Sequence, residues 1–210
     1  MTPLYLITDG RTDGGSGLLE VLEKALAGGV RLVQLREKGL GGRALLELAR
    51  QVRALTTGFG AKLLVNDRAD VAALARADGV HLTARSFTPE EARKVLGPEA
   101  VVGVSTHSAD QALWAERGGA DFITFGPVYP TPSKARYGEP LGLEKLQEVC
   151  SAMTIPVYAI GGIKAANAGD VLAAGASGVA VISAVMAAQD PAASAREILS
   201  KLGPAGTTST

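Results

Sequence analysis

The chain has 210 residues, and its 21 Lys and Arg are balanced by 21 Asp and Glu, with two His and one Cys. Because the formal net charge is zero and no basic or acidic run occurs, we expect neither nucleic acid nor a membrane as a partner. The single cysteine excludes an internal disulfide, and we expect no signal segment. The apolar runs are far shorter than the ~20 residues of a membrane span. These features predict a soluble, cytoplasmic protein of one or two domains.

Eight short apolar runs recur at fairly even intervals along the chain. They are apolar at nearly every position, which is typical of strands that are buried on both faces. The expected strands are residues 4–8, 31–36, 62–66, 79–82, 100–105, 121–125, 156–160 and 178–182. Amphipathic stretches between them predict helices over residues 18–27, 42–54, 69–75, 89–96, 109–117, 143–152, 166–173 and 191–202. Strand and helix therefore alternate along the chain, which is the pattern of parallel βα units.

The joints between helices and strands repeat a short motif. It reads AGGV at 27–30, ADGV at 77–80, GGAD at 118–121 and AGASGV at 174–179. Glycine in these joints supplies the left-handed residue that ends a helix. Eight such units without a linker predict one α/β domain over residues 1–202, a single (β/α)₈ TIM barrel, with a doubly wound open sheet as the alternative. Residues 203–210 lack apolar periodicity and are expected to form a disordered tail.

Polar residues and glycines gather where the predicted strands end. In a parallel barrel the active site forms at that end of the strands. The candidates are Gln34, Arg36, Lys38, Asn66, Asp67, Ser105, His107, Thr131, Ser133, Lys134, Gly161, Gly162, Ile182 and Ser183. Most of them supply hydrogen-bond donors or positive charge, so together they favour phosphorylated ligands.

Several of these positions also have a purely structural interpretation. Asp67 is a candidate Mg²⁺ ligand, but aspartate is also common at helix N-caps. Gly161–Gly162 and Ile182–Ser183 stand where such barrels bind phosphate, whereas two glycines can also simply turn the chain. His107 follows a strand and is a candidate acid or base. His81 lies inside an apolar strand and is predicted to be a core histidine.

A series of longer motifs runs from Leu4 to Val185 in the order LYLITD, VQLREK, LLVNDRADVA, DGVHL, VGVSTHS, FGPVYPTPSK, PVYAIGGI and GVAVISAV. In these motifs the chain resembles the thiamine phosphate synthase superfamily, which also includes thiazole tautomerases of the TenI type. The resemblance implies a (β/α)₈ barrel and an enzyme of thiamine biosynthesis. Synthases couple hydroxymethylpyrimidine diphosphate to the thiazole phosphate, release diphosphate and require Mg²⁺.

The resemblance also implies roles for the candidate residues. The pyrimidine diphosphate would be held by Gln34, Arg36, Lys38, Asn66, Ser105 and Lys134. The thiazole phosphate would be held by Thr131, Ser133, Gly162, Ile182 and Ser183. Asp67 would ligate Mg²⁺, and His107 and Lys134 are the candidate catalytic residues. Diphosphate leaves first in the family mechanism, so cations and donors matter more than a nucleophilic side chain.

One position departs from the synthase pattern. Ser86 stands where synthases usually carry an aspartate that is the second Mg²⁺ ligand, and Glu90 and Glu91 are expected to lie too far along the next helix to replace it. The stretch around Ser86 is similar to that of the tautomerases, which use neither diphosphate nor Mg²⁺ and for which His107 would be the acid and base. We favour the synthase, with the tautomerase as the alternative and a non-catalytic sensor of the thiazole phosphate as a third hypothesis. Self-association into a homo-oligomer remains open.

Overall fold

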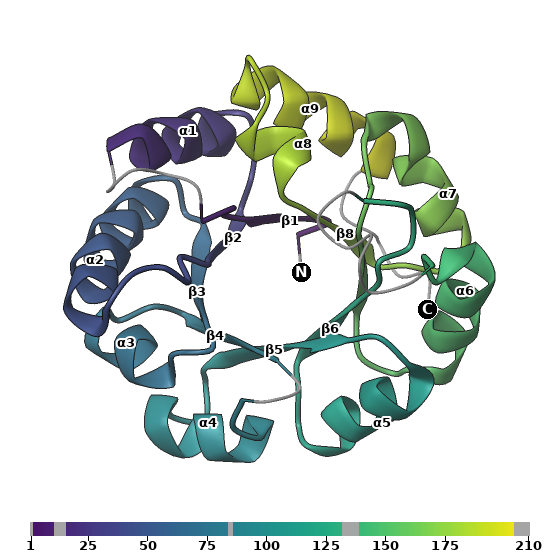
Figure 1. Ribbon diagram of the computed structural model, residues 1–210, viewed down its shortest axis with the longest axis horizontal. Helices are drawn as coiled ribbons and strands as arrows, with labels where there is room; N and C mark the ends of the chain where they lie inside the picture. The colour runs from purple at the N-terminus through teal and green to yellow at the C-terminus, as the bar shows by residue number, and fades with distance from the viewer. Residues whose placement is uncertain (1, 11–15, 84–85, 132–138, 204–210) are drawn as a thin grey trace.

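The computed structural model describes residues 2–10, 16–83, 86–131 and 139–203. Eight parallel strands form a closed barrel in sequence order, and β1 pairs with β8 to complete it (Figure 1). The strands are β1 (Leu4–Ile7), β2 (Leu32–Leu35), β3 (Lys62–Asn66), β4 (Gly79–Leu82), β5 (Val101–Thr106), β6 (Phe122–Phe125), β7 (Val157–Ile160) and β8 (Gly178–Val181). The predicted (β/α)₈ barrel is thus confirmed, and closure between β1 and β8 excludes the open sheet. The predicted tail, 203–210, lies outside the described residues except for Gly203.

The helices form a ring around the barrel (Figure 1). They are α1 (Ser16–Ala27), α2 (Gly42–Gly58), α3 (Ala69–Leu74), α4 (Pro89–Leu96), α5 (Ala109–Arg117), α6 (Gly142–Ala152), α7 (Ala168–Ala173), α8 (Ser183–Met186) and α9 (Pro191–Leu202), with a 3₁₀ turn at Ala165–Asn167. The sequence did not predict α8, since four residues are too few to show a helical period. Among the described residues, no helix is long and apolar enough to cross a lipid bilayer.

The barrel interior is a packed core of its own. Tyr5, Phe122 and Tyr158 pack edge to face inside it, with ring centroids 5.3–6.0 Å apart. A second and larger apolar cluster fills the space between the strands and the helices. Because both faces of the strands are buried, their sequences are almost continuously apolar. Side chains fill the barrel, so ligands can reach only its mouth.

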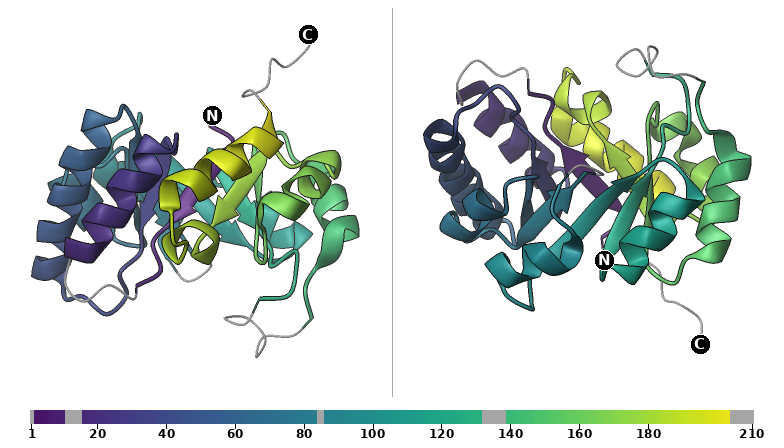
Figure 2. Two further views of the ribbon diagram at one scale, coloured as in Figure 1. Left: turned by 90° about the horizontal axis from the view of Figure 1, so that it is seen from above. Right: turned by 60° about the horizontal axis from the view of Figure 1, so that its bottom comes forward.

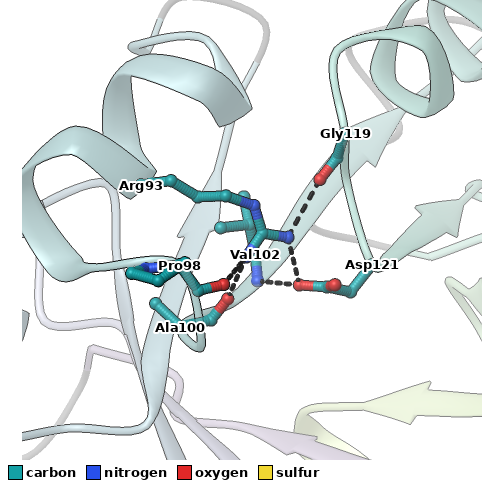
Figure 3. A network of polar contacts seen from close by, with 6 residues as sticks. All are labelled: Arg93, Pro98, Ala100, Val102, Gly119 and Asp121. Atoms are coloured by element: carbon teal, nitrogen blue, oxygen red, sulfur yellow. Dashed lines mark hydrogen bonds and ion pairs between the residues drawn. The ribbon is translucent and has the colours of Figure 1, made fainter.

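Two aspartates brace the joints that precede β4 and β6. Asp121 accepts hydrogen bonds from the backbone N–H of Val102 (2.6 Å) and from Arg93 of α4 (2.9 Å), and Figure 3 shows the same guanidinium bonding to backbone carbonyls. Asp78 accepts in the same way from the N–H of Leu63 (2.7 Å) and from Arg53 of α2 (2.5 Å). Each of these two joints therefore ties the start of its strand to the preceding strand and to the helix before that preceding strand.

The glycines of the joint motif do not all have the predicted role. Gly29, Gly119 and Gly175 adopt positive φ angles of 105°, 85° and 95°, as expected for left-handed residues at helix ends. At the ADGV joint, however, the left-handed residue is Arg76, which directly precedes the motif and has φ of 53°. Gly79 is needed for another reason, because a Cβ there would lie 1.8 Å from the carbonyl oxygen of Val101.

Replacing Arg76 by Gly is expected to stabilise the fold. A non-glycine residue in the left-handed region costs about 1 kcal/mol, and the exposed Arg76 side chain forms no ion pair within the described part of the chain. Urea unfolding followed by circular dichroism should give a free energy of unfolding raised by roughly 0.5–1 kcal/mol. Arg76→Ala keeps the strain and should leave the unfolding midpoint near that of the wild type. Equal midpoints for the two variants would contradict the strain argument.

Candidate active site

The candidate residues lie at the end of the barrel where the strands finish. Figure 2 shows the connections that leave the strands gathered at that end, with the stems of the connection between β6 and α6 extending from it. The two stems are joined by hydrogen bonds from Leu141 N–H to the Pro127 carbonyl (2.8 Å) and from Gly142 N–H to the Val128 carbonyl (3.2 Å). The predicted residues Ser133 and Lys134 follow Thr131 in the sequence and lie outside the described residues. Thr131 is described and is partly exposed at the last residue of one stem.

A chain of hydrogen bonds runs through the barrel interior to its mouth. The Gln34 side-chain amide donates to the Tyr5 hydroxyl at 2.7 Å, and this hydroxyl lies 3.2 Å from Nδ1 of His81. Nε2 of His81 lies 2.9 Å from the Ser105 hydroxyl. Gln34 is only 1% exposed, so it lies below the rim, whereas Ser105 is partly exposed. His81 is a buried core histidine with both ring nitrogens hydrogen-bonded, as the sequence predicts.

The protonation states of His81 and Tyr5 in this series of hydrogen bonds follow from their burial. Burial lowers the pKa of His81 to about 3, and the positive charge of Arg36 lowers it further in the same direction. Burial likewise raises the pKa of Tyr5 far above its usual range. His81 is therefore neutral and Tyr5 keeps its proton at physiological pH.

The end of β2 carries the two predicted cations. Arg36 is partly buried and Lys38 is exposed. The backbone N–H of Arg36 donates to the Thr8 hydroxyl (2.8 Å), which in turn donates to the carboxylate of Glu37 (2.6 Å). Glu37 is 7% exposed and was not among the predicted residues. This buried network fixes the backbone from which Arg36 extends, so Glu37 has a structural part in the site.

Asp67 directly follows β3 and holds an unusual backbone conformation. Its φ angle is +63°, which aspartate tolerates better than most residues, and its N–H donates to the His81 carbonyl at 2.9 Å. The Ser86 hydroxyl donates to its carboxylate. The N-cap of α3 is Arg68, and no side chain caps that helix. The N-cap interpretation of Asp67 is therefore wrong, and its carboxylate is exposed at the barrel mouth.

A hollow at this place is lined by Asp67, Ser86, Phe87 and Glu91. Glu91 therefore lines the same hollow as Asp67. Its carboxylate, however, accepts hydrogen bonds from the N–H (2.8 Å) and hydroxyl (3.0 Å) of Thr88 in the capping box of α4. Among the described residues, no three His, Cys, Asp or Glu side chains converge as a metal cage. Asp67 is the carboxylate at this hollow that is not used in a helix cap.

His107 follows β5 with an exposed side chain. Its Nδ1 lies 2.5 Å from the carbonyl oxygen of Gly126, and a carbonyl can only accept. The neutral imidazole therefore carries its proton on Nδ1, which leaves Nε2 as the basic nitrogen. A base with this orientation stands at the mouth between β5 and β6.

The predicted phosphate loops are shaped by close packing. A Cβ at Gly161 would lie 2.5 Å from Pro127, and one at Gly162 would lie 2.7 Å from the Pro130 carbonyl oxygen. The Asn167 amide donates to the Gly162 carbonyl (3.1 Å) and so fixes the turn. Both glycines are thus needed for packing, and this need is independent of any ligand that the loop binds.

Ile182 and Ser183 mark the start of α8, where Ile182 is the N-cap and Ser183 the first helical residue. The first N–H groups of a helix have no partner within it, so they are available to an anion. Asn66 ends β3 opposite His81 of β4 and is partly exposed. The fold therefore brings the described candidates to one end of the barrel, as predicted, while their binding roles remain predictions.

A family model described as thiamine monophosphate synthase matches residues 4–185, which is most of the chain. The chain belongs to this family. The match covers all eight strands and every candidate site residue described above, so the family resemblance seen in the motifs is confirmed.

Relatives within the thiamine monophosphate synthase family match over nearly their full length. A putative thiamine-phosphate synthase of Geobacter sulfurreducens is 57% identical over 96% of this chain and 94% of the relative. A thiamine-phosphate synthase of Moorella thermoacetica is 47% identical over 93% of each chain. The structure of thiamine phosphate pyrophosphorylase from Pyrococcus furiosus matches with a TM-score of 0.86 and 38% identity over 95% of this chain and 94% of that one. A 3-hexulose-6-phosphate synthase, at 20% identity and a TM-score of 0.71, shares the fold alone.

Proposed function

We propose that this chain is a thiamine-phosphate synthase, a transferase that joins hydroxymethylpyrimidine diphosphate to the thiazole phosphate and releases diphosphate. The observation that carries the proposal is the 57% and 47% identity to synthases over nearly the whole chain, and it is supported by Arg36, Asn66 and Asp67 at the strand ends of this chain. A tautomerase that never binds diphosphate would have little use for these residues. Cytoplasmic location and self-association stay predictions.

The chemistry requires stabilisation of a departing polyanion. Arg36 and Lys38 supply positive charge at the end of β2, and the Asn66 amide supplies a donor at the end of β3. Lys134, from the connection between β6 and α6, would add a further cation, and the thiazole phosphate would bind where β7 and β8 end. Preorganised donors of this kind favour bond cleavage because their dipoles are already oriented when charge develops.

The donor set at the hollow fits Mg²⁺ only in part. Mg²⁺ is often held by one or two carboxylates together with phosphate oxygens and water, so Asp67 could hold it once diphosphate is bound. When bound there, Mg²⁺ would neutralise charge on the diphosphate oxygens. Ser86 supplies a hydroxyl instead of a second carboxylate. We therefore expect Mg²⁺ affinity to depend on diphosphate.

Replacing Ser86 by Asp is expected to tighten Mg²⁺ binding and to make stability depend on Mg²⁺. Ser86 contacts the Asp67 carboxylate, so an aspartate there creates two adjacent carboxylates that repel each other without a cation. We expect roughly tenfold tighter Mg²⁺ binding, because carboxylate oxygens are the ligands a hard cation prefers. Titration of the melting temperature with MgCl₂ measures this without any substrate.

Ser86→Asn is the matched control, since an asparagine side chain has nearly the same volume as the aspartate of the first variant but carries no charge. It should melt at a temperature that Mg²⁺ does not change. If the aspartate and asparagine variants respond to Mg²⁺ alike, Asp67 and Ser86 do not share a cation site.

The proposed reaction is tested by incubating the protein with both substrates and Mg²⁺ and measuring diphosphate release. A synthase releases one diphosphate for each thiamine phosphate formed. Conversion of the thiazole phosphate without diphosphate release would instead indicate the tautomerase, with His107 as the acid and base. Binding of the thiazole phosphate without turnover of either kind would leave only the sensor. Either of these last two results overturns the proposal.

A further inference from the structure

The hydrogen-bond chain inside the barrel has a direction. The Gln34 amide nitrogen can only donate, so the Tyr5 hydroxyl accepts from it and has its own proton left for Nδ1 of His81. A neutral imidazole has one proton, and with Nδ1 accepting, that proton is on Nε2. Nε2–H then donates to the Ser105 oxygen, 2.9 Å away. Because the Ser105 oxygen accepts from His81 in the barrel interior, its own hydroxyl proton is available to an acceptor at the barrel mouth.

The core is shaped to hold the imidazole in this one place. The His81 ring lies 5.6 Å from the ring centroid of Tyr5 and 5.7 Å from that of Phe122. A Cβ at Gly103 would lie 2.6 Å from Nδ1 of His81 and 2.3 Å from Phe122, so only glycine leaves room for both rings. A ring packed this closely on several sides cannot change its hydrogen-bond partners without disturbing its neighbours.

We propose that Tyr5 and His81 are positioning residues that fix the hydroxyl proton of Ser105 toward the barrel mouth, so that Ser105 meets the substrate as a donor. With the proposed function, on which this part rests, the group above Ser105 is an acceptor atom of the pyrimidine substrate, either a ring nitrogen or a diphosphate oxygen. The direction of the chain selects against a substrate that presents a donor at that position, because two donors would then face each other.

Nuclear magnetic resonance of the imidazole nitrogens tests the direction in the ligand-free protein. The chain has two histidines, His81 and His107, and the structure gives them opposite tautomers. Long-range ¹H–¹⁵N spectra should show His81 protonated on Nε2 and the neutral form of His107 protonated on Nδ1. A His107→Gln variant assigns the two signals. Finding His81 protonated on Nδ1 would mean that the chain runs in reverse, and it would overturn the proposal.

Tyr5→Phe and Tyr158→Phe form a matched pair for the functional part. Both remove one buried hydroxyl from the same aromatic cluster, but the Tyr158 hydroxyl donates to the Thr2 carbonyl and not to the chain of hydrogen bonds. Tyr5→Phe should leave His81 with mixed tautomers and lower kcat/KM for the pyrimidine diphosphate roughly tenfold, with KM for the thiazole phosphate unchanged. Tyr158→Phe should change neither the His81 signal nor kcat/KM. Equal effects of the two variants would refute a positioning role.

A conservative substitution at His81 separates positioning from simple core packing. His81→Gln keeps an amide N–H that can reach Ser105, whereas His81→Leu keeps only volume. We expect the glutamine variant to retain more activity than the leucine variant at equal fractions of folded protein. If the wild type releases no diphosphate, the proposed function fails, yet the His81 tautomer still decides the direction of the chain. An active wild type with the reverse tautomer defeats this inference alone.

Discussion

Replacing Asp67 by Asn is expected to lower kcat/KM for the pyrimidine diphosphate about 100-fold and to raise the Mg²⁺ concentration needed for half-maximal activity. Asparagine tolerates the positive φ of this position, and its side-chain oxygen can still accept from Ser86. The substitution therefore removes charge with little change of shape. A 100-fold loss corresponds to about 2.7 kcal/mol of transition-state stabilisation, which is the size expected when a cation loses its anionic ligand.

Asp70→Asn is the matched control for this experiment. Asp70 lies three residues further on, is exposed, and pairs with Arg68 on the surface at 2.6 Å. Surface ion pairs of this kind contribute little, so activity and Mg²⁺ dependence should equal those of the wild type. Initial rates of diphosphate release over a range of Mg²⁺ concentrations measure both variants. Wild-type Mg²⁺ dependence in the Asp67 variant would show that this carboxylate does not bind the cation.

The sequence predicted the barrel well because its signal is strong and local. Continuous apolar runs indicate strands buried on both faces, and the observed strand ends differ from the predicted ones by about one residue, as for 31–36 against Leu32–Leu35. The same signal hides which side chains point into the barrel, since both faces are apolar. Tyr5 was therefore assigned to a strand without any indication that its hydroxyl contacts His81, 76 residues further along the chain.

The site was predictable where a single strand end carries the chemistry, and less so where two elements meet. The polar ends of β2, β3 and β5 lie at one end of the barrel because the strands are parallel. The Asp67–Ser86 contact and the buried Glu37 depend on how separate connections pack together. The spacing of a linear sequence does not report such contacts, because it contains no information about the distance between two loops.

The opposite end of the barrel is expected to determine stability, and Arg93→Ala tests this. Arg93 donates to the carbonyls of Pro98 (3.0 Å), Ala100 (2.5 Å) and Gly119 (3.0 Å) as well as to Asp121 (Figure 3). Truncation leaves these acceptors without their shared donor, although water can reach some of them because the Arg93 side chain is 25% exposed. We expect a loss of about 2–3 kcal/mol in the free energy of unfolding, measured by urea denaturation.

Lys94→Ala is the control on the same helix, because Lys94 forms an exposed ion pair with Glu90 and should contribute less than about 0.5 kcal/mol. Both variants should keep the wild-type kcat at 25 °C, since Arg93 braces the starts of β5 and β6 and the candidate site lies where these strands end. A fall in kcat without a fall in stability would mean that the two ends of the barrel are coupled. With kcat unchanged, the Arg93–Asp121 joint serves the fold alone, and the chemistry depends on the loops at the other end.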